Sequence, residues 1–169
     1  MKTRKMVVLS LMVSLALAIS VLELSIPIPI PIPGARLGFS NIIILTVICM
    51  YDFKSSITVS ILKSVLLMLV TGSVSSFLYS FVGSLLSTFT MYLSVKFLQK
   101  YLTLVGVSEI GSFFHNFGQI LVASFVMDNI SIFYYLPMLI IIGIFTGFFV
   151  GISTNFLTQH FHKIIRGTI

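Results

Sequence analysis

The sequence predicts an all-α integral membrane protein, a single domain (residues 1–169) built from six transmembrane helices. Hydrophobic residues make up 57% of the 169 residues and charged residues only 8%, whereas soluble domains carry roughly 25% charged residues. Apolar runs also alternate with short polar breaks along the chain. Because a spanning helix needs about 20 mostly apolar residues, the length leaves room for around six spans and for no soluble catalytic domain.

The first expected helix, Met6–Leu24, follows a basic start. The opening residues, MKTRKMVVLSLMVSLALAIS, resemble a secretory signal peptide, and the tripeptide ALA matches a cleavage site. The apolar run continues to Leu22, however, and the later spans would hold the chain in the bilayer. We therefore expect this segment to be retained as the first span.

Five further helices are expected from hydropathy and polar punctuation. The second is short for a full crossing, and the break TGSVSS between the third and the fourth is the least sharply defined boundary. Connections are brief except for a proline-rich segment after the first helix and QKYLTLVG after the fourth. The five helices are expected at Leu37–Tyr51, Ser55–Thr71, Phe77–Phe97, Ser108–Met127 and Tyr134–Leu157.

The cationic residues predict how these helices are oriented. With six spans, eight cations fall on one side of the membrane, and the positive-inside tendency makes that side the cytoplasm. Arg36 falls on the opposite side, and Lys63 lies within the third helix. Five or seven spans would split the terminal clusters, so we expect a cell-membrane protein with both termini in the cytoplasm. The eight cations are Lys2, Arg4, Lys5, Lys54, Lys96, Lys100, Lys163 and Arg166.

The segment between the first two helices, ELSIPIPIPIPGARLGFSN, contains four prolines at alternate positions. Proline lacks an N–H and has a fixed φ, so such a run forbids a helix and favours extended geometry for each preceding isoleucine. At about 3.1 Å per residue the run could cross roughly 25 Å. The segment is therefore either a stiff spacer or a fixed lid over an outward-facing cavity. We favour the lid because of the polar residues that follow it.

The end of this segment carries a candidate anion site. Gly34 and Gly38 flank Arg36, and Asn41 lies one helical turn inside the second helix. Free N–H groups and the helix dipole favour negative charge at a helix N-terminus. The alternative is that Arg36 extends to lipid headgroups, and the sequence leaves both interpretations open.

The fifth helix carries a second group of polar residues, within GSFFHNFGQILVA. His115 and Gln119 are four residues apart and share one helix face, with Asn116 beside them. Polar groups inside a span usually face the bundle interior, where they bind a ligand or a proton, or hydrogen-bond to neighbouring helices. No second His, Cys or carboxylate lies at ligand spacing on this helix, so we expect no metal site. The candidate solute-binding residues are Arg36, Gly38, Asn41, His115, Asn116 and Gln119.

Two further charged residues lie at the ends or in the middle of predicted spans. Lys63 is expected to extend its ammonium group to the cytoplasmic face, with Glu109 as the alternative partner inside the bundle. Glu23, at the outer end of the first helix, is a candidate partner for Arg36.

The first helix also carries small residues every four positions, SxxxSxxxA, a spacing that permits close helix packing. These residues serve either packing within the chain or docking of another membrane protein.

Several chemistries are excluded by what the sequence lacks. There is no G-x-x-x-x-G-K-[ST] loop, so the chain does not by itself drive transport with ATP. Its two aspartates, Asp52 and Asp128, are expected at opposite membrane faces, whereas magnesium–diphosphate chemistry calls for clustered carboxylates. No nucleophile–base arrangement is present. We therefore expect a protein that is not an enzyme and has no cofactor. The formal charge of +6 comes from cations scattered at span ends, which argues against a nucleic-acid partner.

Two of these stretches together resemble a known family. The proline-rich segment running into PGARLGFSNI, followed later by FHNFGQILVA, resembles the Gx transporters, also labelled heptaprenyl diphosphate synthase component I. That family is similar to the substrate-binding S components of energy-coupling factor (ECF) transporters. The resemblance covers nearly the whole chain. Where the family usually has Lys in the first motif, this chain has Arg36, which keeps the charge but alters the geometry.

The resemblance implies an S-component-like bundle of six helices with a ligand site near the outer face, under the first loop. It also implies work with a transmembrane coupling subunit and two ATP-binding subunits; ATP coupling rests on the family analogy alone. Two functions are therefore expected. The first is a membrane transport component that captures a small solute, anionic or isoprenoid-like. The second is a non-catalytic membrane accessory subunit of polyprenyl diphosphate or quinone biosynthesis. A structural membrane scaffold is a third possibility, since each polar residue also has a packing explanation.

Overall fold

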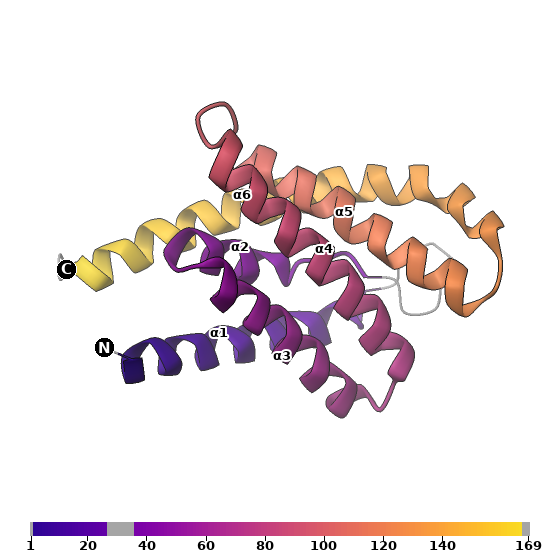
Figure 1. Ribbon diagram of the computed structural model, residues 1–169, viewed down its shortest axis with the longest axis horizontal. Helices are drawn as coiled ribbons and strands as arrows, with labels where there is room; N and C mark the ends of the chain where they lie inside the picture. The colour runs from indigo at the N-terminus through magenta and orange to yellow at the C-terminus, as the bar shows by residue number, and fades with distance from the viewer. Residues whose placement is uncertain (1, 27–35, 167–169) are drawn as a thin grey trace.

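The computed structural model describes residues 2–26 and 36–166 (Figure 1). Within these residues the chain forms six α-helices and one short 3₁₀ helix, with no strand, which confirms the predicted all-α bundle. The alternating prolines and Gly34 lie outside the described residues, so the predicted lid stays a prediction. The elements are α1 Lys2–Glu23, α2 Asn41–Met50, α3 Phe53–Thr71, α4 Val74–Leu98, α5 Leu104–Val126, η1 Ile130–Tyr135 and α6 Leu136–Arg166.

Several of these helices have the length and composition of membrane spans. Four stretches are long and apolar enough to cross a bilayer: Thr3–Glu23, Phe53–Thr71, Val74–Leu98 and Ile130–Phe161. Helix α5 is comparably long at 23 residues, but it carries the three polar side chains of the HNFGQ stretch, which lower its hydropathy. The chain is thus a multi-pass membrane protein.

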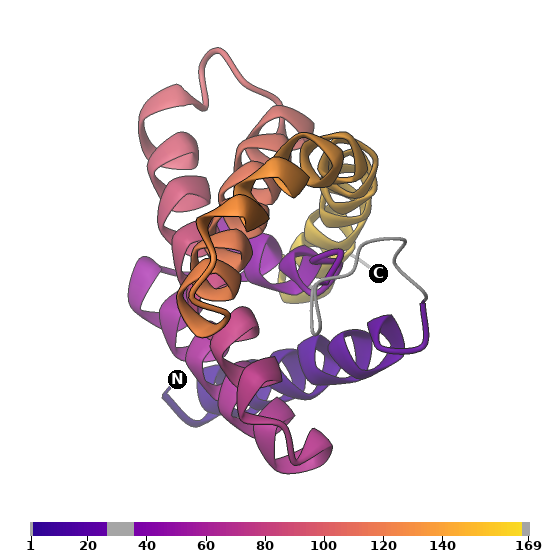
Figure 2. The same cartoon turned by 90° about the vertical axis from the view of Figure 1, so that its right-hand side faces the viewer.

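Helix α2 is shorter than predicted. It contains 10 residues, about 15 Å of helix at 1.5 Å per residue, which is half of a hydrocarbon core about 30 Å thick. The predicted start at Leu37 was wrong, because Gly38 has a φ of +86° that no right-handed helix accommodates. Its centre is fully buried at Ile44, Leu45 and Val47, and it contacts α1, α3, α4, α5 and α6. Figure 2, which looks along the bundle, shows α2 in the middle of the other helices.

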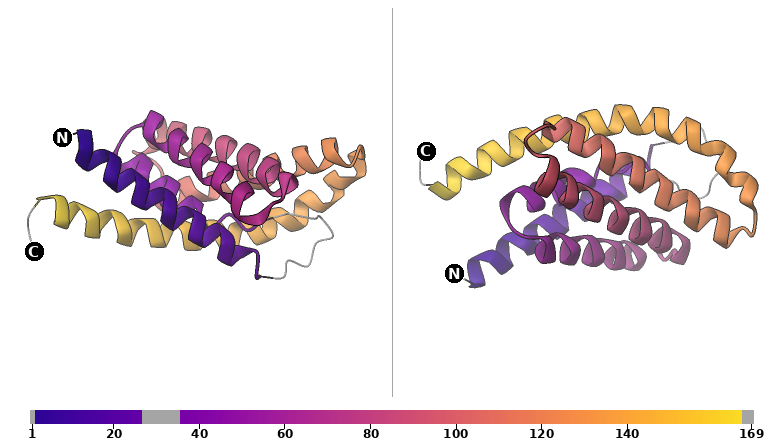
Figure 3. Two further views of the ribbon diagram at one scale, coloured as in Figure 1. Left: turned by 90° about the horizontal axis from the view of Figure 1, so that it is seen from below. Right: turned by 45° about the horizontal axis from the view of Figure 1, so that its top comes forward.

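The two ends of the bundle carry different connections. The start of α1 and the end of α6 lie at the same end (Figures 1 and 3). The α2–α3 and α4–α5 connections also point toward that end, whereas the α3–α4 connection and η1 lie at the other. This alternation agrees with the predicted six-helix arrangement. The last helix was predicted to stop at Leu157, and this was wrong: α6 continues to Arg166, so Lys163 and Arg166 belong to the helix rather than following it.

The turn between α2 and α3 is tied to α1 by an ion pair. Asp52 precedes α3 and accepts a hydrogen bond from the N–H of Ser55 at 2.8 Å, which satisfies a donor at the helix start. Its other carboxylate oxygen lies 2.6 Å from the Nζ of Lys5. The hydrogen bond from Lys5 and that from Ser55 lower the pKa of Asp52 to about 2. The carboxylate therefore stays ionised at all physiological pH values and holds the two segments together.

Helices α4, α5 and α6 pack closely through small residues. A Cβ on Gly118 of α5 would lie 3.0 Å from the Cα of Gly83 on α4. Between α5 and α6, the hydroxyls of Ser108 and Ser112 donate to the carbonyls of Gly147 and Gly143 at 2.6 and 2.8 Å. Small residues let helix backbones approach in a membrane, where packing and interhelical hydrogen bonds drive association. This close packing positions the polar face of α5 against its neighbours.

We predict that Gly151→Ala destabilises the protein by about 1–3 kcal/mol, the usual range for forcing extra atoms into a packed interior. A Cβ at this position would lie 2.5 Å from the backbone Cα of Val105, which has no freedom to move aside. Thermal unfolding in detergent micelles measures the effect. The control is Gly106→Ala, whose Cβ would meet only the Leu102 side chain, at 3.2 Å. An unchanged midpoint for Gly151→Ala would contradict the α5–α6 contact.

Candidate functional site

Charged and polar side chains are buried together inside the bundle, around the short segment that leads into α2. Glu23 at the end of α1, Arg36 in the segment and Lys63 on α3 expose only 4%, 3% and 1% of their surface. Each of them bonds to the segment or belongs to it, and the three are close enough to interact electrostatically. His115, on α5, is equally buried beside them. We call residues Ser20, Glu23, Arg36, Gly38, Ser40, Asn41, Lys63, Ser84, His115 and Gln119 the polar cluster.

The backbone of Arg36 is held by a side chain from α5. Its N–H donates to the Oε1 of Gln119 at 2.7 Å, and its C=O accepts from the Nε2 of Gln119 at 2.9 Å. One amide thus satisfies both backbone groups of a buried residue that has no helix or sheet partner. The sequence predicted Gln119 as a site residue but gave no sign of this pairing, because the two residues are 83 positions apart.

The guanidinium of Arg36 is only partly engaged. Its Nη1 donates to the backbone carbonyl of Ser20 on α1, at a long distance of 3.5 Å. Its Nε and Nη2 are buried and have no hydrogen-bond partner among the described residues. The expectation that Arg36 extends to lipid headgroups does not fit this burial.

Gly38 brings the chain close to His115. A Cβ at this position would lie 3.0 Å from the Cδ2 of His115 and 3.2 Å from the Nδ2 of Asn41. Its φ of +86° is also a conformation that favours glycine. On α4, a Cβ at Gly83 would lie 3.0 Å from the Nδ1 of the same imidazole. The ring is therefore held between two glycines. Its Nδ1 lies beside the backbone of Gly83, but neither ring nitrogen makes a hydrogen bond of normal geometry within the described part of the chain.

Lys63 lies in the interior, so the prediction that it reaches the cytoplasmic face was wrong. It is the eleventh of the 19 residues of α3, and its Nζ donates to the hydroxyls of Ser40 at 2.9 Å and Ser84 at 2.7 Å. Glu109, the alternative partner, packs instead against Gly147 of α6. Hydropathy alone does not tell which side of a span faces lipid, and this is why the prediction failed.

A sequence signal for the position of Lys63 does exist. Serines and threonines recur at spacings of three and four along the facing sides of α3 and α4, and these pairs hydrogen-bond across the two helices: Ser60 with Thr88 at 2.6 Å, and Ser64 with Ser80 at 3.0 Å. Lys63 and Ser84 lie on the same faces, next to these pairs. A hydroxyl-rich seam of this kind marks a protein interior rather than a lipid-facing side.

Glu23 bonds to the segment rather than to Arg36. Its Oε1 accepts a short hydrogen bond from the backbone N–H of Phe39. Among the side chains that the structure describes, those of residues 3–26 and 36–161, the one ion pair is that of Lys5 with Asp52, so the expected pairing of Glu23 with Arg36 is not formed. The carboxylate instead satisfies backbone groups at the entrance to α2.

Five of the six predicted site residues come together, and the sixth points to another helix. Arg36, Gly38, Asn41, His115 and Gln119 belong to the polar cluster. The Nδ2 of Asn116 donates to the carbonyl of Leu139 on α6 at 2.8 Å, which matches the predicted alternative of an interhelical hydrogen bond. The Oδ1 atoms of Asn41 and Asn116 have no partner among the described residues.

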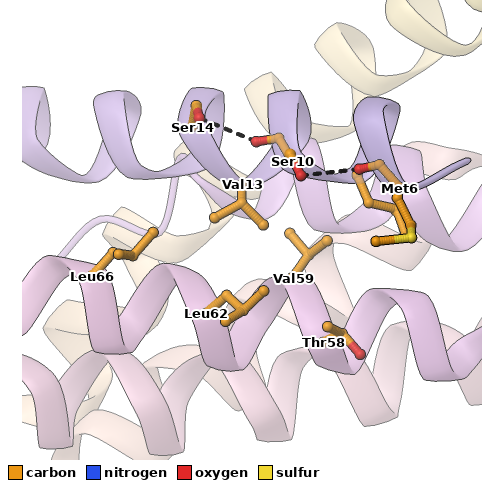
Figure 4. Close-up of a pocket in the computed structure, with 9 residues that line it drawn as sticks. Met6, Ser10, Val13, Ser14, Thr58, Val59, Leu62 and Leu66 are labelled. Atoms are coloured by element: carbon orange, nitrogen blue, oxygen red, sulfur yellow. Dashed lines mark hydrogen bonds between the residues drawn. The ribbon is translucent and has the colours of Figure 1, made fainter. Parts of the chain in front are cut away.

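A groove on the outer surface lies between α1 and α3, away from the polar cluster (Figure 4). It has a volume of about 430 Å³ and is lined by Met6, Leu9, Ser10, Val13, Ser14, Thr58, Val59, Leu62 and Leu66. Its two serines bond back to their own helix, Ser10 to the Met6 carbonyl and Ser14 to the Ser10 carbonyl. Both serines and Ala18 are exposed, so this row of small residues is not used for packing within the chain.

The fold and the cluster define a multi-pass helical membrane protein with a charged, buried interior. Residues 12–157 match the family described as heptaprenyl diphosphate synthase component I, and the chain belongs to this family. The family resemblance predicted from the sequence is thereby confirmed. No curated protein and no solved structure matches the chain. The word component in the family's name implies association with other subunits of a complex.

We predict that Gln119→Met destabilises the protein, because it leaves the N–H and C=O of Arg36 buried without partners. Each unsatisfied buried group costs about 1–3 kcal/mol, and methionine keeps the length of the side chain. The unfolding midpoint in detergent measures the change. Gln159→Met is the control, since Gln159 is exposed and bonds only to exposed Asn155. Equal midpoints for the two variants would show that Gln119 does not hold the segment.

Proposed function

We propose that this chain is the membrane-embedded, substrate-binding component of a transporter of the S-component type. It captures a small solute, anionic or isoprenoid-like, at the polar cluster. The observation that carries the proposal is the concentration of buried polar atoms without partners: Nε and Nη2 of Arg36, Oδ1 of Asn41, and both ring nitrogens of His115. Roughly 90% or more of buried polar groups in proteins form hydrogen bonds. Several buried polar atoms without partners in one place are therefore typical of a binding site.

The contacts around these atoms support a ligand site rather than a fastening point. Residues that only fasten helices use their polar atoms on each other, as Ser112 does with Gly143. Arg36 and His115 do not: the described chain leaves most of their donors and acceptors unused. The residues that would contact the substrate are therefore Arg36, Asn41 and His115, while Gly38 and Gln119 hold the segment around them. Asn116, on the side of α5 that faces α6, adds an Oδ1 atom that has no hydrogen-bond partner in the described chain.

The partners follow from the same proposal. The sequence contains no nucleotide-binding loop, so the energy would come from a transmembrane coupling subunit with ATP-binding subunits. The exposed small residues Ser10, Ser14 and Ala18 on α1 suit close approach of a helix from such a subunit, and lipid covers the remaining apolar surface. The protein acts in the cell membrane with both termini in the cytoplasm, as the cations of α1, α3 and α4 indicate.

The family's name favours one alternative, a non-catalytic accessory subunit of polyprenyl diphosphate or quinone biosynthesis. An accessory subunit would raise the prenyl-transferring activity of a partner enzyme and would retain no small solute. A transport component would retain a solute and leave that activity unchanged. Adding the purified protein to a prenyl diphosphate synthase therefore separates the two functions.

We predict that the protein purified in lipid nanodiscs carries a small solute, detectable by mass spectrometry of the released material. Arg36→Ala should weaken its binding about ten- to a hundredfold, because a hydrogen bond to a charged group contributes roughly 1.5–3 kcal/mol. The solute-free protein should not melt earlier, since the guanidinium makes one long hydrogen bond, at 3.5 Å. Lys100→Ala, at an exposed end, is the control. A variant that melts early yet binds normally would make Arg36 a packing residue and place the pocket elsewhere.

The orientation of the protein in the membrane can be tested by cysteine labelling in a Cys49→Ser background, which removes the native thiol. Asp128, exposed beyond the end of α5, and Lys100, exposed beyond the end of α4, lie at opposite ends of the bundle. Asp128→Cys should react with an impermeant maleimide from outside intact cells. Lys100→Cys should react only after permeabilisation. The reverse pattern would place the termini outside and overturn the proposed orientation.

A further inference from the structure

The charges of the polar cluster do not balance. In their ordinary protonation states Arg36 and Lys63 are cations and Glu23 is an anion, so the three together would carry one excess positive charge. No ion pair joins them within the described residues, where Lys5 and Asp52 form the one pair. Glu23 is already bonded to the N–H of Phe39, and Lys63 to two neutral hydroxyls. A buried charge without a counter-charge is strongly unfavourable, so the cluster is suited to receive one negative charge.

The free side of Arg36 indicates the shape of that negative group. Nη1 is used on the carbonyl of Ser20, whereas Nε and Nη2 have no partner in the described chain. These two atoms form one edge of the planar guanidinium, and their N–H groups point in parallel. Such an edge binds two oxygens of one carboxylate or similar group in a bidentate manner. Lysine, with its point charge, would not offer this geometry.

The neighbouring free atoms indicate the rest of the ligand. Gly38 lies against both His115 and the side-chain amide of Asn41, so these two side chains are next to each other. The Oδ1 of Asn41 is an acceptor without a donor, and a neutral imidazole offers one donor and one acceptor. A ligand that fills this place therefore carries at least one N–H or O–H group. A prenyl chain would leave all of these atoms unpaired.

We propose that the solute is a polar monoanion, held through two oxygens of its charged group by the Nε–Nη2 edge of Arg36, with Lys63 setting the requirement for a single negative charge. This inference rests on the proposed function and chooses between its two solute classes. A diphosphate brings two or three negative charges, which exceeds the one charge that the cluster lacks. An uncharged isoprenoid leaves the excess positive charge in place.

Stability without a ligand provides the first test. If Lys63 is an uncompensated cation, Lys63→Met should raise the unfolding midpoint of protein washed free of solutes, because it removes the excess charge and keeps the length of the side chain. Glu23→Gln should lower it, since it increases the imbalance. Lys100→Met, at an exposed end, is the control and should leave the midpoint unchanged. A lowered midpoint for Lys63→Met would show that the cluster is balanced without a ligand, and would overturn the inference.

A matched pair of small probes provides the second test. Formate is the smallest planar monoanion with two oxygens, and formamide has nearly the same shape without the charge. Sodium formate should raise the unfolding midpoint relative to sodium chloride at equal ionic strength, and formamide at the same concentration should not. Arg36→Lys, which keeps the charge but removes the edge, should abolish the formate shift, and so should Lys63→Met.

The outcomes separate this inference from the proposed function. Three results would contradict the proposal that the solute is a monoanion: equal midpoint shifts with formate and formamide, no shift with formate, or a full formate shift in Lys63→Met. A neutral or multiply charged solute released from the nanodiscs would do the same, while leaving solute binding intact. If no solute is released and the protein instead stimulates a prenyl-transferring partner, the proposed function itself fails.

Discussion

The structure depends on the burial of one non-helical segment, residues 36–40, inside a bundle of membrane helices. Away from water, every backbone N–H and C=O in such a segment needs a partner from the protein. Two elements supply such partners: Glu23 of α1 accepts from the N–H of Phe39, and Gln119 of α5 bonds both backbone groups of Arg36. Lys63 of α3 adds a hydrogen bond to the side-chain hydroxyl of Ser40. The costly charged residues of the spans are thus placed where the segment requires them. Their remaining atoms form the candidate site.

The same constraint explains the shape of the surrounding helices. The buried segment leads directly into α2, which has only 10 residues and contacts all five other α-helices. The neighbouring helices must approach closely enough to hold the segment, and small residues permit this at Gly83, Gly118 and Gly151. Hydroxyls on α3 and α4 then satisfy each other and Lys63 across the interface. A larger or more apolar residue at these positions would separate the helices or leave the lysine without partners.

The sequence was a good guide to what depends on local composition and a poor one to what depends on distant contacts. Hydropathy located six helices, and the end of α3 at Thr71 was correct, since Gly72 adopts the left-handed conformation that stops a helix. It misplaced the start of α2 because one positive φ is not visible in an apolar run. The sequence also placed Arg36, Asn41 and Gln119 in one candidate site, because they are polar residues at the entrance to one predicted span and inside another. The two hydrogen bonds between Gln119 and the backbone of Arg36 depend on which helix faces are adjacent, and so does the inward direction of Lys63. The sequence of a single span does not show which faces will be adjacent.

Helix α1 connects the polar cluster to the outer surface of the bundle. Near the end of α1, the carbonyl of Ser20 accepts a hydrogen bond from Arg36, and the carboxylate of Glu23 accepts one from Phe39. The helix is therefore bonded directly to the segment. Along its other side, Ser10, Ser14 and Ala18 are exposed, and Ser10 and Ser14 border the groove with α3. The helix that bonds to Arg36 therefore also carries the exposed small residues, to which the proposed function assigns the contact with a neighbouring membrane protein.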